Sequence, residues 1–269
     1  MLIIRDLTIA LLLFAVLFNA ALYSWRATLL GKRAAYFPDE GLGLVEATRA
    51  FVTECAALAA VLLLIPIGWV LPMRSGTNGR GPIILVHGWG LNRGALWLLR
   101  HRLRRAGWGP VYSFTYPSFR ADVERAAVRL HGFIERLTNQ QSLTLIGHSL
   151  GGLVLRHCAH HCPVPTVRRI ITLGTPHSGT LLARVPGPTT GRLAPGSTFL
   201  DSLNTADPVP ERCDAIALYS TFDAMILPPS NAQYPGAFNI QINDVGHNAL
   251  LFSSKVYRLL AENLAAPLR

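Results

Sequence analysis

The sequence predicts an α/β fold, in which a mostly parallel sheet is covered by helices on both faces and preceded by two long apolar helices. Of the 269 residues, 50% are hydrophobic and 15% are charged, which provides a large core and excludes disordered and fibrous proteins. Two charge-free runs, residues 7–25 and 55–73, lie near the amino terminus. From Pro82 onward, short apolar segments alternate with amphipathic ones, which is typical of a parallel sheet with covering helices.

The two apolar runs are long enough to cross a membrane. Each holds 19 residues without a charge, and at about 1.5 Å per helical residue such a run nearly spans the bilayer core of about 30 Å. A cleaved signal peptide is the alternative for the first run, but its apolar stretch exceeds the roughly 7–15 residues of a signal core and a second run follows. We therefore expect residues 1–73 to form a membrane anchor with two transmembrane helices at about 7–25 and 55–73, at the bacterial inner membrane. Basic residues are nearly balanced between the two sides, so the sequence does not assign the face on which the rest of the chain lies.

The charges divide unevenly along the chain. Residues 1–73 carry five basic and five acidic residues, so the whole formal charge of +10 belongs to the part after Met73. The densest basic stretch, residues 101–105, has the pattern of a solvated helix face, and no nucleic-acid-binding motif accompanies it. The basic excess therefore indicates an anionic membrane surface or simple solubility, and we expect no nucleic-acid partner.

Four cysteines are too few for a disulfide scaffold, and spacing alone leaves open whether Cys158 or Cys162 pairs with Cys213. Two of them belong to the run His-Cys-Ala-His-His-Cys. Helical spacing places His157 with His161, and Cys158 with Cys162, on common faces, where such a pair could bind zinc. No distant second pair of ligands is evident, so we favour the surface end of a helix and expect neither a metal nor a cofactor.

The segment after a short flexible linker at residues 74–81 divides into alternating strands and helices. The strands are short and apolar, as expected of strands buried on both faces, and lie at 83–86, 111–115, 143–146, 170–173, 215–219 and 238–242. The helices have apolar residues at helical spacing and lie at 93–106, 121–137, 150–161 and 248–264. Prolines and glycines interrupt residues 178–213, where we expect a large insertion over the sheet edge with one short helix near 199–203. That insertion either lines a substrate pocket or is a structural excursion.

Ser149 lies in the run Gly-His-Ser-Leu-Gly, residues 147–151, directly after a predicted strand and before a predicted helix. A serine at such a junction sits in a tight, strained turn, where a side chain at the flanking positions would strike neighbouring backbone, and glycines are therefore needed on both sides. This context is that of a nucleophile elbow. It makes Ser149 the candidate catalytic nucleophile.

A serine hydroxyl is a weak nucleophile, so it needs a base that takes its proton and an acid that orients the base. After a nucleophile elbow, these residues follow in the chain as serine, acid and histidine. His247 is the only histidine after Asp223 and follows the last predicted strand, which makes it the candidate base. Asp223, four residues past Tyr219 at the end of the preceding strand, is the favoured acid, and Asp244, in the loop of His247 itself, is the rival.

The negative charge that develops on a substrate carbonyl needs preorganised amide donors, each worth about 3 kcal/mol of the barrier. Leu150 supplies one amide at the amino end of the helix after Ser149. We expect the other from Trp89 in the run His-Gly-Trp-Gly, which follows the first strand after the linker. For His87 and for His148, next to the nucleophile, a hydrogen-bonded structural role is the simpler interpretation.

From about Pro82 to its end, the chain resembles the small bacterial triacylglycerol lipases of the α/β-hydrolase fold. The motifs that carry the resemblance are Leu-Val-His-Gly-Trp-Gly at 85–90, Gly-His-Ser-Leu-Gly-Gly at 147–152, Thr-Leu-Gly-Thr-Pro-His-Ser-Gly at 172–179, the segment 219–228, and Gly246-His247. The resemblance implies an α/β-hydrolase catalytic domain over residues 82–269. The triad that it implies is Ser149, Asp223 and His247, with the amides of Trp89 and Leu150 as oxyanion donors. The substrate-binding residues expected around them are His87, Gly88, His148, Thr175, Pro176 and His177, of which the last three would shape the acyl-binding side.

These observations predict a membrane-anchored serine hydrolase that cleaves carboxylic esters, a lipase or esterase, through an acyl-enzyme on Ser149. A fixed anchor limits access to oil droplets, so we expect lipid or acyl esters near the membrane as substrates rather than bulk triglyceride. Two alternatives stay open. The same nucleophile would serve an acyltransferase that passes the acyl chain to an alcohol, and the scaffold would serve a non-catalytic, membrane-tethered interaction protein.

Overall fold

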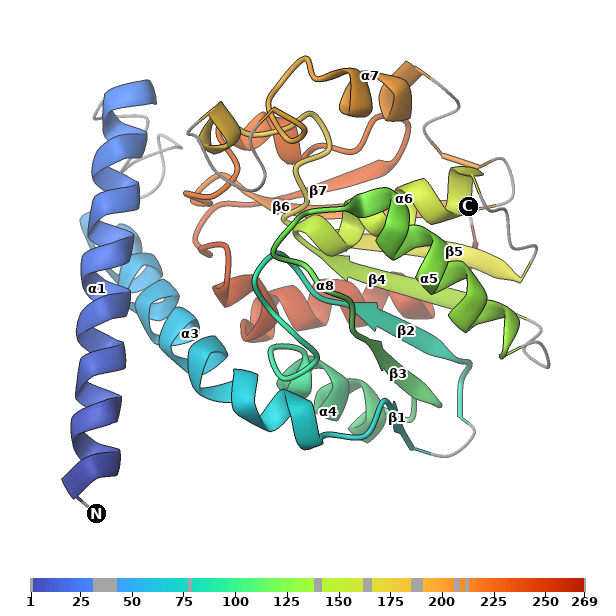
Figure 1. Cartoon of the computed structure of the whole chain (residues 1–269), viewed down its shortest axis with the longest axis horizontal. Coiled ribbons are helices and arrows are strands. Elements are labelled where there is room, and N and C mark those ends of the chain that lie inside the picture. Colours follow the sequence, from blue (N-terminus) through green and yellow to red (C-terminus); the bar gives the residue numbers. More distant parts are fainter. Residues whose placement is uncertain are drawn as a thin grey trace.

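The computed structural model describes residues 2–30, 43–76, 79–137, 142–161, 166–184, 191–205, 209–210 and 213–268. It contains a twisted sheet with helices on both faces and two long helices at one side, α1 (Leu2–Leu30) and α3 (Leu44–Val70). Figure 1 shows that α3 begins beside α1 and then runs away from it, toward the edge of the sheet. The two predicted apolar helices are therefore present, and they have different surroundings.

The sheet has six parallel strands and one antiparallel edge strand, in the order β1-β3-β2-β4-β5-β6-β7. The strands are β1 (Arg74–Ser75), β2 (Ile83–Val86), β3 (Val111–Phe114), β4 (Leu143–His148), β5 (Val167–Leu173), β6 (Asp214–Ser220) and β7 (Phe238–Ile242). The parallel strands confirm the six predicted from apolar runs. All residues of β2, β3 and β6 are buried, as expected of strands that are covered on both faces.

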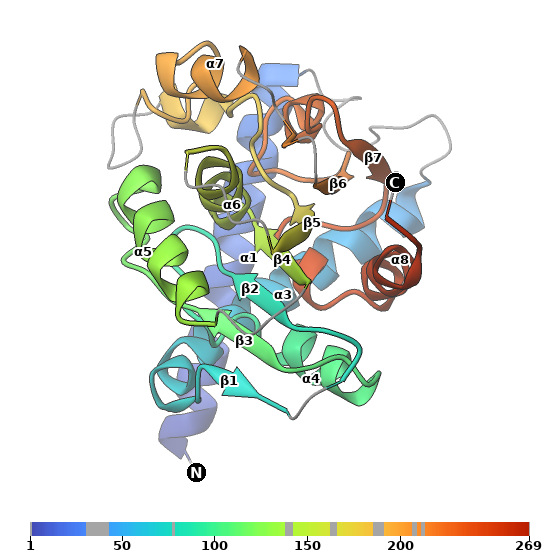
Figure 2. The same ribbon diagram turned by 90° about the vertical axis from the view of Figure 1, so that its right-hand side faces the viewer.

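Helices cover the sheet in two layers, with α5 and α6 on one face and α4 and α8 on the other (Figure 2). Their bounds are α4 (Trp97–Arg105), α5 (Val123–Glu135), α6 (Leu150–His161), α7 (Thr198–Thr205) and α8 (Ser254–Ala265), with short 3₁₀ helices η1 (Leu181–Arg184), η2 (Pro229–Ala232) and η3 (Ala249–Leu251). Alternate residues of β2 enter the two layers. Ile84 and Val86 pack with residues of α5 and α6, whereas Ile83 and Leu85 pack with residues of α4 and α8.

One of the two long helices, α3, is built into the core of the sheet domain, which we define as residues 79–268. Ala57 and Val61 are buried in the apolar cluster that also contains residues of α4 and α8. The side chain of Asn92 donates a hydrogen bond to the carbonyl of Ile65 at 2.8 Å. α3 and the sheet domain thus share one apolar core, and the division at residue 73 into a membrane anchor and a catalytic domain stays a prediction.

The predicted flexible linker at residues 74–81 is attached to the sheet in its described part, so that prediction is wrong there. Residues 74–75 form β1, which pairs with β3 in antiparallel orientation. The amide of Gly79 donates to the carbonyl of Gly109 at 2.9 Å. Main-chain hydrogen bonds of this kind leave no side-chain signature, which is why a composition rich in glycine and polar residues indicated a linker.

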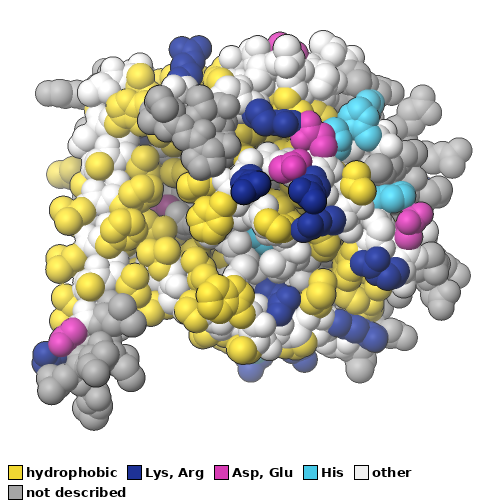
Figure 3. Space-filling model, in the orientation of Figure 1, with side chains coloured by type: hydrophobic (Ala, Val, Ile, Leu, Met, Phe, Trp, Pro, Cys, Tyr) yellow, Lys and Arg dark blue, Asp and Glu magenta, His cyan; other side chains and the backbone are white. Residues whose placement is uncertain are grey.

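The other long helix, α1, leaves most of its apolar side chains exposed. Ile9, Leu13, Phe14 and Leu17 are between 48% and 69% exposed. In Figure 3 hydrophobic side chains cover this helix at the left of the molecule, whereas Lys and Arg side chains gather over the sheet domain. By length and composition both α1 and α3 could cross a membrane, although a core helix of a soluble protein and a signal sequence meet the same criteria. Membrane crossing therefore stays a prediction.

The insertion at residues 178–213 is described in part. Its described residues contain η1 and α7, and α7 confirms the short helix expected near 199–203. Residues 185–190, 206–208 and 211–212 lie outside the described residues. Leu200 and Leu203 are buried in the apolar cluster that contains residues of α5 and α6. This part of the insertion therefore covers the sheet domain, and a pocket-lining role for it stays a prediction.

Candidate active site

The candidate site residues follow the carboxyl ends of parallel strands. Ser149 follows β4, Asp223 follows β6 and His247 follows β7, while Trp89 follows β2 and Thr175 follows β5. The carboxyl ends of parallel strands meet at one edge of a sheet, which is where ligands bind in folds of this class. The topology thus brings residues from five separate stretches of the chain to one edge.

Ser149 sits in a strained turn, as the sequence predicts. Its φ is +53°, in the left-handed region that residues other than glycine rarely adopt. A Cβ at Gly147 would lie 2.6 Å from the amide nitrogen of Gly152, and one at Gly151 would lie 2.5 Å from the carbonyl oxygen of Val86. Close backbone contacts therefore require both glycines, which confirms the reason predicted for them.

Asp223 and His247 are in contact, and both are buried. Nδ1 of His247 lies 2.7 Å from Oδ2 of Asp223. The other carboxylate oxygen, Oδ1, accepts hydrogen bonds from the amides of Met225 and Ile226 at 2.7 and 3.0 Å, so the carboxylate is held in place. Burial by itself lowers the pKa of His247, but the charges of Asp223 and Glu54 and the hydrogen bond to Asp223 outweigh it and hold this pKa above its usual value. The site therefore favours the imidazolium that proton transfer from a nucleophile would create.

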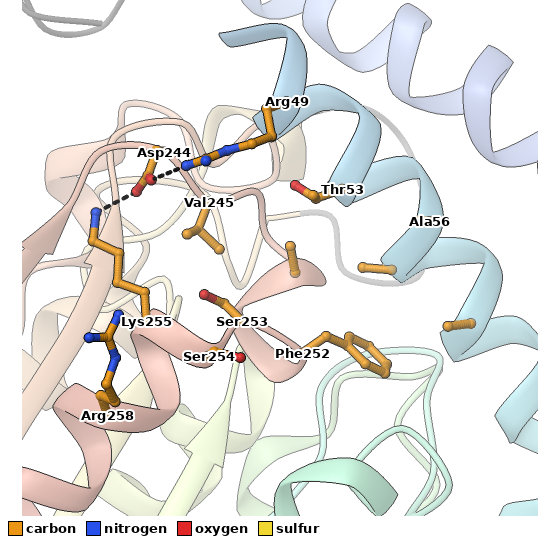
Figure 4. Close-up of a pocket in the computed structure, with 13 residues that line it drawn as sticks. Arg49, Thr53, Ala56, Asp244, Val245, Phe252, Ser253, Ser254, Lys255 and Arg258 are labelled. Atoms are coloured by element: carbon orange, nitrogen blue, oxygen red, sulfur yellow. Dashed lines mark hydrogen bonds and ion pairs between the residues drawn. The ribbon is translucent and has the colours of Figure 1, made fainter. Parts of the chain in front are cut away.

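The rival acid, Asp244, lies at the surface rather than beside the imidazole. Figure 4 shows its carboxylate between Lys255 and Arg49, at 2.6 and 3.3 Å. These ion pairs border a pocket of about 650 Å³ between α3 and α8. The geometry thus supports Asp223, and not Asp244, as the acid that orients His247.

His247 packs against His148, the residue that directly precedes Ser149 in the chain. The ring centroids of His148 and His247 are 4.8 Å apart, and Nε2 of His148 lies 3.1 Å from the carbonyl oxygen of His247. A Cβ at Gly174 would lie 3.4 Å from Nδ1 of His247, so the loop after β5 borders the same imidazole. Within the described chain, no hydrogen bond joins the Ser149 hydroxyl to the His247 ring. Catalytic hydrogen bonds of this type are often long before substrate binds.

The candidate oxyanion amides are those of Trp89 and Leu150, and none of the described residues accepts a hydrogen bond from either. Leu150 is the first residue of α6, and the first amides of a helix have no partner within the helix. Trp89 lies in the turn after β2, where a Cβ at the preceding Gly88 would be 2.9 Å from Cβ of Ser149. The turn that carries Trp89 therefore lies against the nucleophile, and Leu150 directly follows it in the chain. The role of the two amides as oxyanion donors stays a prediction.

His87 and His148 are buried and bonded to protein groups. The ring of His87 stacks on Tyr116 with centroids 4.7 Å apart, and its Nδ1 lies 3.0 Å from the carbonyl oxygen of Gly88. Burial lowers the pKa of His87 to about 4 and that of His148 to about 3, so both rings are neutral at neutral pH. These surroundings fit the structural role favoured from the sequence, and substrate contact by His87, Gly88 and His148 stays a prediction.

The Thr-Pro-His segment after β5, residues 175–177, is bonded to the turn that carries Ser149. The hydroxyl of Thr175 donates to the carbonyl of Ser149 at 2.9 Å. His177 is fully buried and stacks on Tyr234 with ring centroids 4.4 Å apart, and Pro176 is buried as well. Thr175 thus supports the turn that carries the serine, and the acyl-binding role of the three residues stays a prediction.

Three polar residues of the long helices, Tyr23, Arg26 and Glu54, contact the loops that carry Asp223 and His247, and sequence reasoning missed them. The sequence nevertheless contains an indication of two of these contacts. Arg26 directly follows the first charge-free run and Glu54 directly precedes the second. A charged residue within a long apolar helix is costly unless it has a partner, so each indicated a buried contact.

No disulfide joins the described cysteines, and Cys162 lies outside the described residues. The described residues also contain no group of three or more His, Cys, Asp or Glu that could hold a metal ion. His157 and His161 lie side by side with ring centroids 4.2 Å apart, as their helical spacing predicts.

The site has three features of an α/β-hydrolase. The serine is strained and lies between a parallel strand and a helix, an Asp–His pair lies on two later loops of the same sheet edge, and two amides lie beside the serine. The chain belongs to the alpha/beta hydrolase family, because its residues 83–260 match that family. The match extends from β2 into α8, so α1 and α3 lie before it. No curated protein sequence matches the chain.

Solved structures with a similar fold include lipases and an esterase. The mature form of lipase BlEst2 from Bacillus licheniformis has a TM-score of 0.60 at 18% identity, with 73% of this chain and 96% of the lipase covered. Lipase B of Aspergillus fumigatus has a TM-score of 0.59 at 18% identity, with 72% of this chain and 55% of the lipase covered. A thermophilic esterase from Thermogutta terrifontis has a TM-score of 0.51 at 19% identity, with 71% and 91% covered. At these identities the similarity shows the fold alone.

Proposed function

We propose that this protein is a membrane-held serine hydrolase of carboxylic esters, a lipase or esterase, that works through an acyl-enzyme on Ser149. Oγ of Ser149 attacks the ester carbonyl carbon while Nε2 of His247 takes its proton, and Asp223 stabilises the imidazolium. The amides of Trp89 and Leu150 hold the oxyanion. The bond from carbon to the alcohol oxygen then breaks, His247 gives its proton to the leaving alcohol, and the acyl group stays on Ser149.

The second half of the reaction repeats these roles with water. His247 takes a proton from a water molecule, whose oxygen attacks the acyl carbon. The bond to Oγ of Ser149 then breaks, and Oγ takes back the proton as the carboxylic acid leaves. An alcohol in place of water would give acyl transfer instead.

The observation that carries this proposal is the 2.7 Å contact between Nδ1 of His247 and the buried Asp223, on the same sheet edge as a serine held at φ +53°. A carboxylate that accepts from Nδ1 favours the tautomer in which Nε2 is an acceptor. That tautomer is the one able to take a proton from a serine hydroxyl.

The membrane part of the proposal rests on the exposed apolar side chains of α1, which would be in contact with lipid, at the bacterial inner membrane. A catalytic domain held at a bilayer meets amphipathic esters, so we propose lipid or acyl esters near the membrane as substrates. The named lipases and the named esterase of similar fold support an ester substrate.

The test is the variant Ser149→Ala in the full chain, assayed on p-nitrophenyl esters of several acyl lengths. We expect turnover to fall by at least about 1,000-fold, because removal of the nucleophile leaves only binding and oxyanion contributions. Ser202→Ala, at an exposed serine of α7, is the matched control and should keep wild-type turnover. Unchanged turnover in Ser149→Ala, together with no labelling of the wild type by a fluorophosphonate, would show a non-catalytic protein. Product analysis with a competing alcohol separates hydrolysis from acyl transfer.

A further inference from the structure

Polar side chains of the two long helices hold the backbone of the two loops that carry the candidate acid and base. The Tyr23 hydroxyl donates to the carbonyl of Phe222 at 2.6 Å. The guanidinium of Arg26 donates to the carbonyls of Asp223 and Thr221, the latter at 2.6 Å. These contacts join α1 to the loop of the acid, between positions that are 195 to 199 residues apart in the chain.

The corresponding contact to the loop of the base is made by Glu54 of α3, which is 2% exposed. Its Oε1 accepts from the amide and the side-chain nitrogen of Asn248 at 3.0 and 2.8 Å. Its Oε2 accepts from the amide of Ala249 at 2.8 Å. Both carboxylate oxygens of Glu54 thus accept hydrogen bonds, and all the donors belong to the two residues that directly follow His247.

The chemistry of that loop explains why an acceptor is needed there. Residues Ala249–Leu251 form η3, and the first amides of a helical turn have no partner within the turn. Within a chain the residue at the start of a helix often supplies the acceptor. Here Asn248, the residue before η3, makes no such side-chain hydrogen bond, and Glu54 supplies the acceptor from another helix.

The glycine before His247 fits the same arrangement. A Cβ at Gly246 would lie 2.4 Å from Oε2 of Glu54. The carboxylate therefore occupies the space that a side chain at position 246 would fill. Glu54 therefore lies against the main chain on both sides of His247. It borders Gly246 before the histidine and accepts from the amides of Asn248 and Ala249 after it.

We propose that Glu54 is a positioning residue for His247, which fixes the loop of the general base from a helix outside the matched family region. This inference rests on the proposed function, because it assigns Glu54 a part in the same reaction. Glu54 does not contact the reacting atoms, so it acts through the position and the charge of the imidazole. Asp223 orients the ring from one side, and Glu54 holds the main chain to which the ring is attached.

The charge of Glu54 adds a second effect that is separable from position. Glu54 is among the groups that raise the pKa of His247, after Asp223. Loss of its negative charge lowers that pKa, so His247 becomes neutral, and able to act as a base, at a lower pH. A residue that only supported the fold would leave this pH unchanged.

The experiment compares Glu54→Gln with Glu46→Gln, a matched change from carboxylate to amide at an exposed position of the same helix. Turnover of a water-soluble p-nitrophenyl ester is measured in detergent micelles, per active site titrated with a fluorophosphonate. For Glu54→Gln we expect kcat to fall about 10- to 100-fold with little change in KM, as a misplaced catalytic group predicts. We also expect the ascending limb of the profile of kcat/KM against pH to move down by roughly half a pH unit. Glu46→Gln should match the wild type in both respects.

A second variant, Glu54→Asp, separates position from charge. It keeps the negative charge and shortens the side chain, so kcat should fall while the ascending limb stays near that of the wild type. If Glu54→Gln yields no folded protein, Glu54→Asp decides the matter in the same assay. Wild-type kcat and an unshifted limb in Glu54→Gln, or wild-type kcat in Glu54→Asp, would overturn the positioning role. Failure of the wild type to label at Ser149 would instead overturn the proposed function.

Discussion

The two long apolar helices, α1 and α3, differ in what covers their apolar side chains. In the most apolar 18-residue window of each helix, 17% of α1 is buried against 39% of α3. Val61 of α3 lies in a core shared with α4 and α8, whereas Leu17 of α1 is 69% exposed. Hydropathy over a helix therefore does not distinguish a side chain that is buried in a protein core from one that is exposed on the surface of the protein.

A charge placed in the core-facing side of α3 should have the largest effect. Val61→Asp would bury a carboxylate without a partner, so we expect a loss of about 4 kcal/mol or more in the free energy of unfolding, enough to prevent stable folding. The measurement is thermal unfolding in detergent, together with fluorophosphonate labelling of Ser149. The matched control is Leu63→Asp on the exposed side of the same helix, which should label normally.

The comparison between the helices would fail if Val61→Asp folded and labelled as the wild type does but lost its attachment to membranes. That result would mean that α3 is surrounded by lipid and not by the sheet domain.

A charge on the outer side of α1 should act on membrane binding alone. Leu17→Asp puts a carboxylate at the centre of the exposed apolar face, which costs about 3 kcal/mol in lipid, or roughly a 100-fold loss of partitioning. Co-sedimentation with phospholipid vesicles measures this, with Leu17→Ala as the control. Turnover of a soluble ester should not change. Unaltered sedimentation of Leu17→Asp would exclude α1 as the part in contact with lipid.

The smallest effect is expected where α1 contacts the sheet domain. Tyr23→Phe removes the hydroxyl that donates to the carbonyl of Phe222 and leaves the ring in place, so we expect a loss of about 1 kcal/mol in the free energy of unfolding. Denaturant unfolding in detergent measures it. Tyr257→Phe, which removes a comparable hydrogen bond to the carbonyl of Arg102 within the sheet domain, is the reference. A stability loss for Tyr257→Phe but none for Tyr23→Phe would indicate that α1 is not seated on the acid loop in solution.

Features that depend on neighbouring residues were predictable from the sequence. A strand buried on both faces must be apolar along its length, so a run such as Ile83–Val86 was recognisable by itself. The edge strand Phe238–Ile242 was also recognised, although most of its residues are exposed and the expected burial on both faces is wrong there. The turn around Ser149 requires glycines at fixed offsets, and these lie within five residues of one another. Asp223 was favoured over Asp244 because it follows the strand before the one that leads to His247, whereas Asp244 lies in the loop of His247 itself.

Features that depend on contacts between distant segments were not predictable. Tyr23 and Phe222 are 199 positions apart, and Glu54 and Ala249 are 195 positions apart. Nothing in the local pattern of an apolar helix states which loop its polar residues meet. Likewise, the stacking of His177 on Tyr234 depends on a residue 57 positions later that no motif contains.

The close approach of Glu54 to Gly246 ties two distant positions to one another. Because a methyl group at residue 246 would need the volume that the carboxylate fills, an alanine there and a glutamate at 54 exclude each other. Among homologous sequences, these two sites should accordingly vary as a pair, and a bulkier residue at the later site should occur with a shorter one at the earlier.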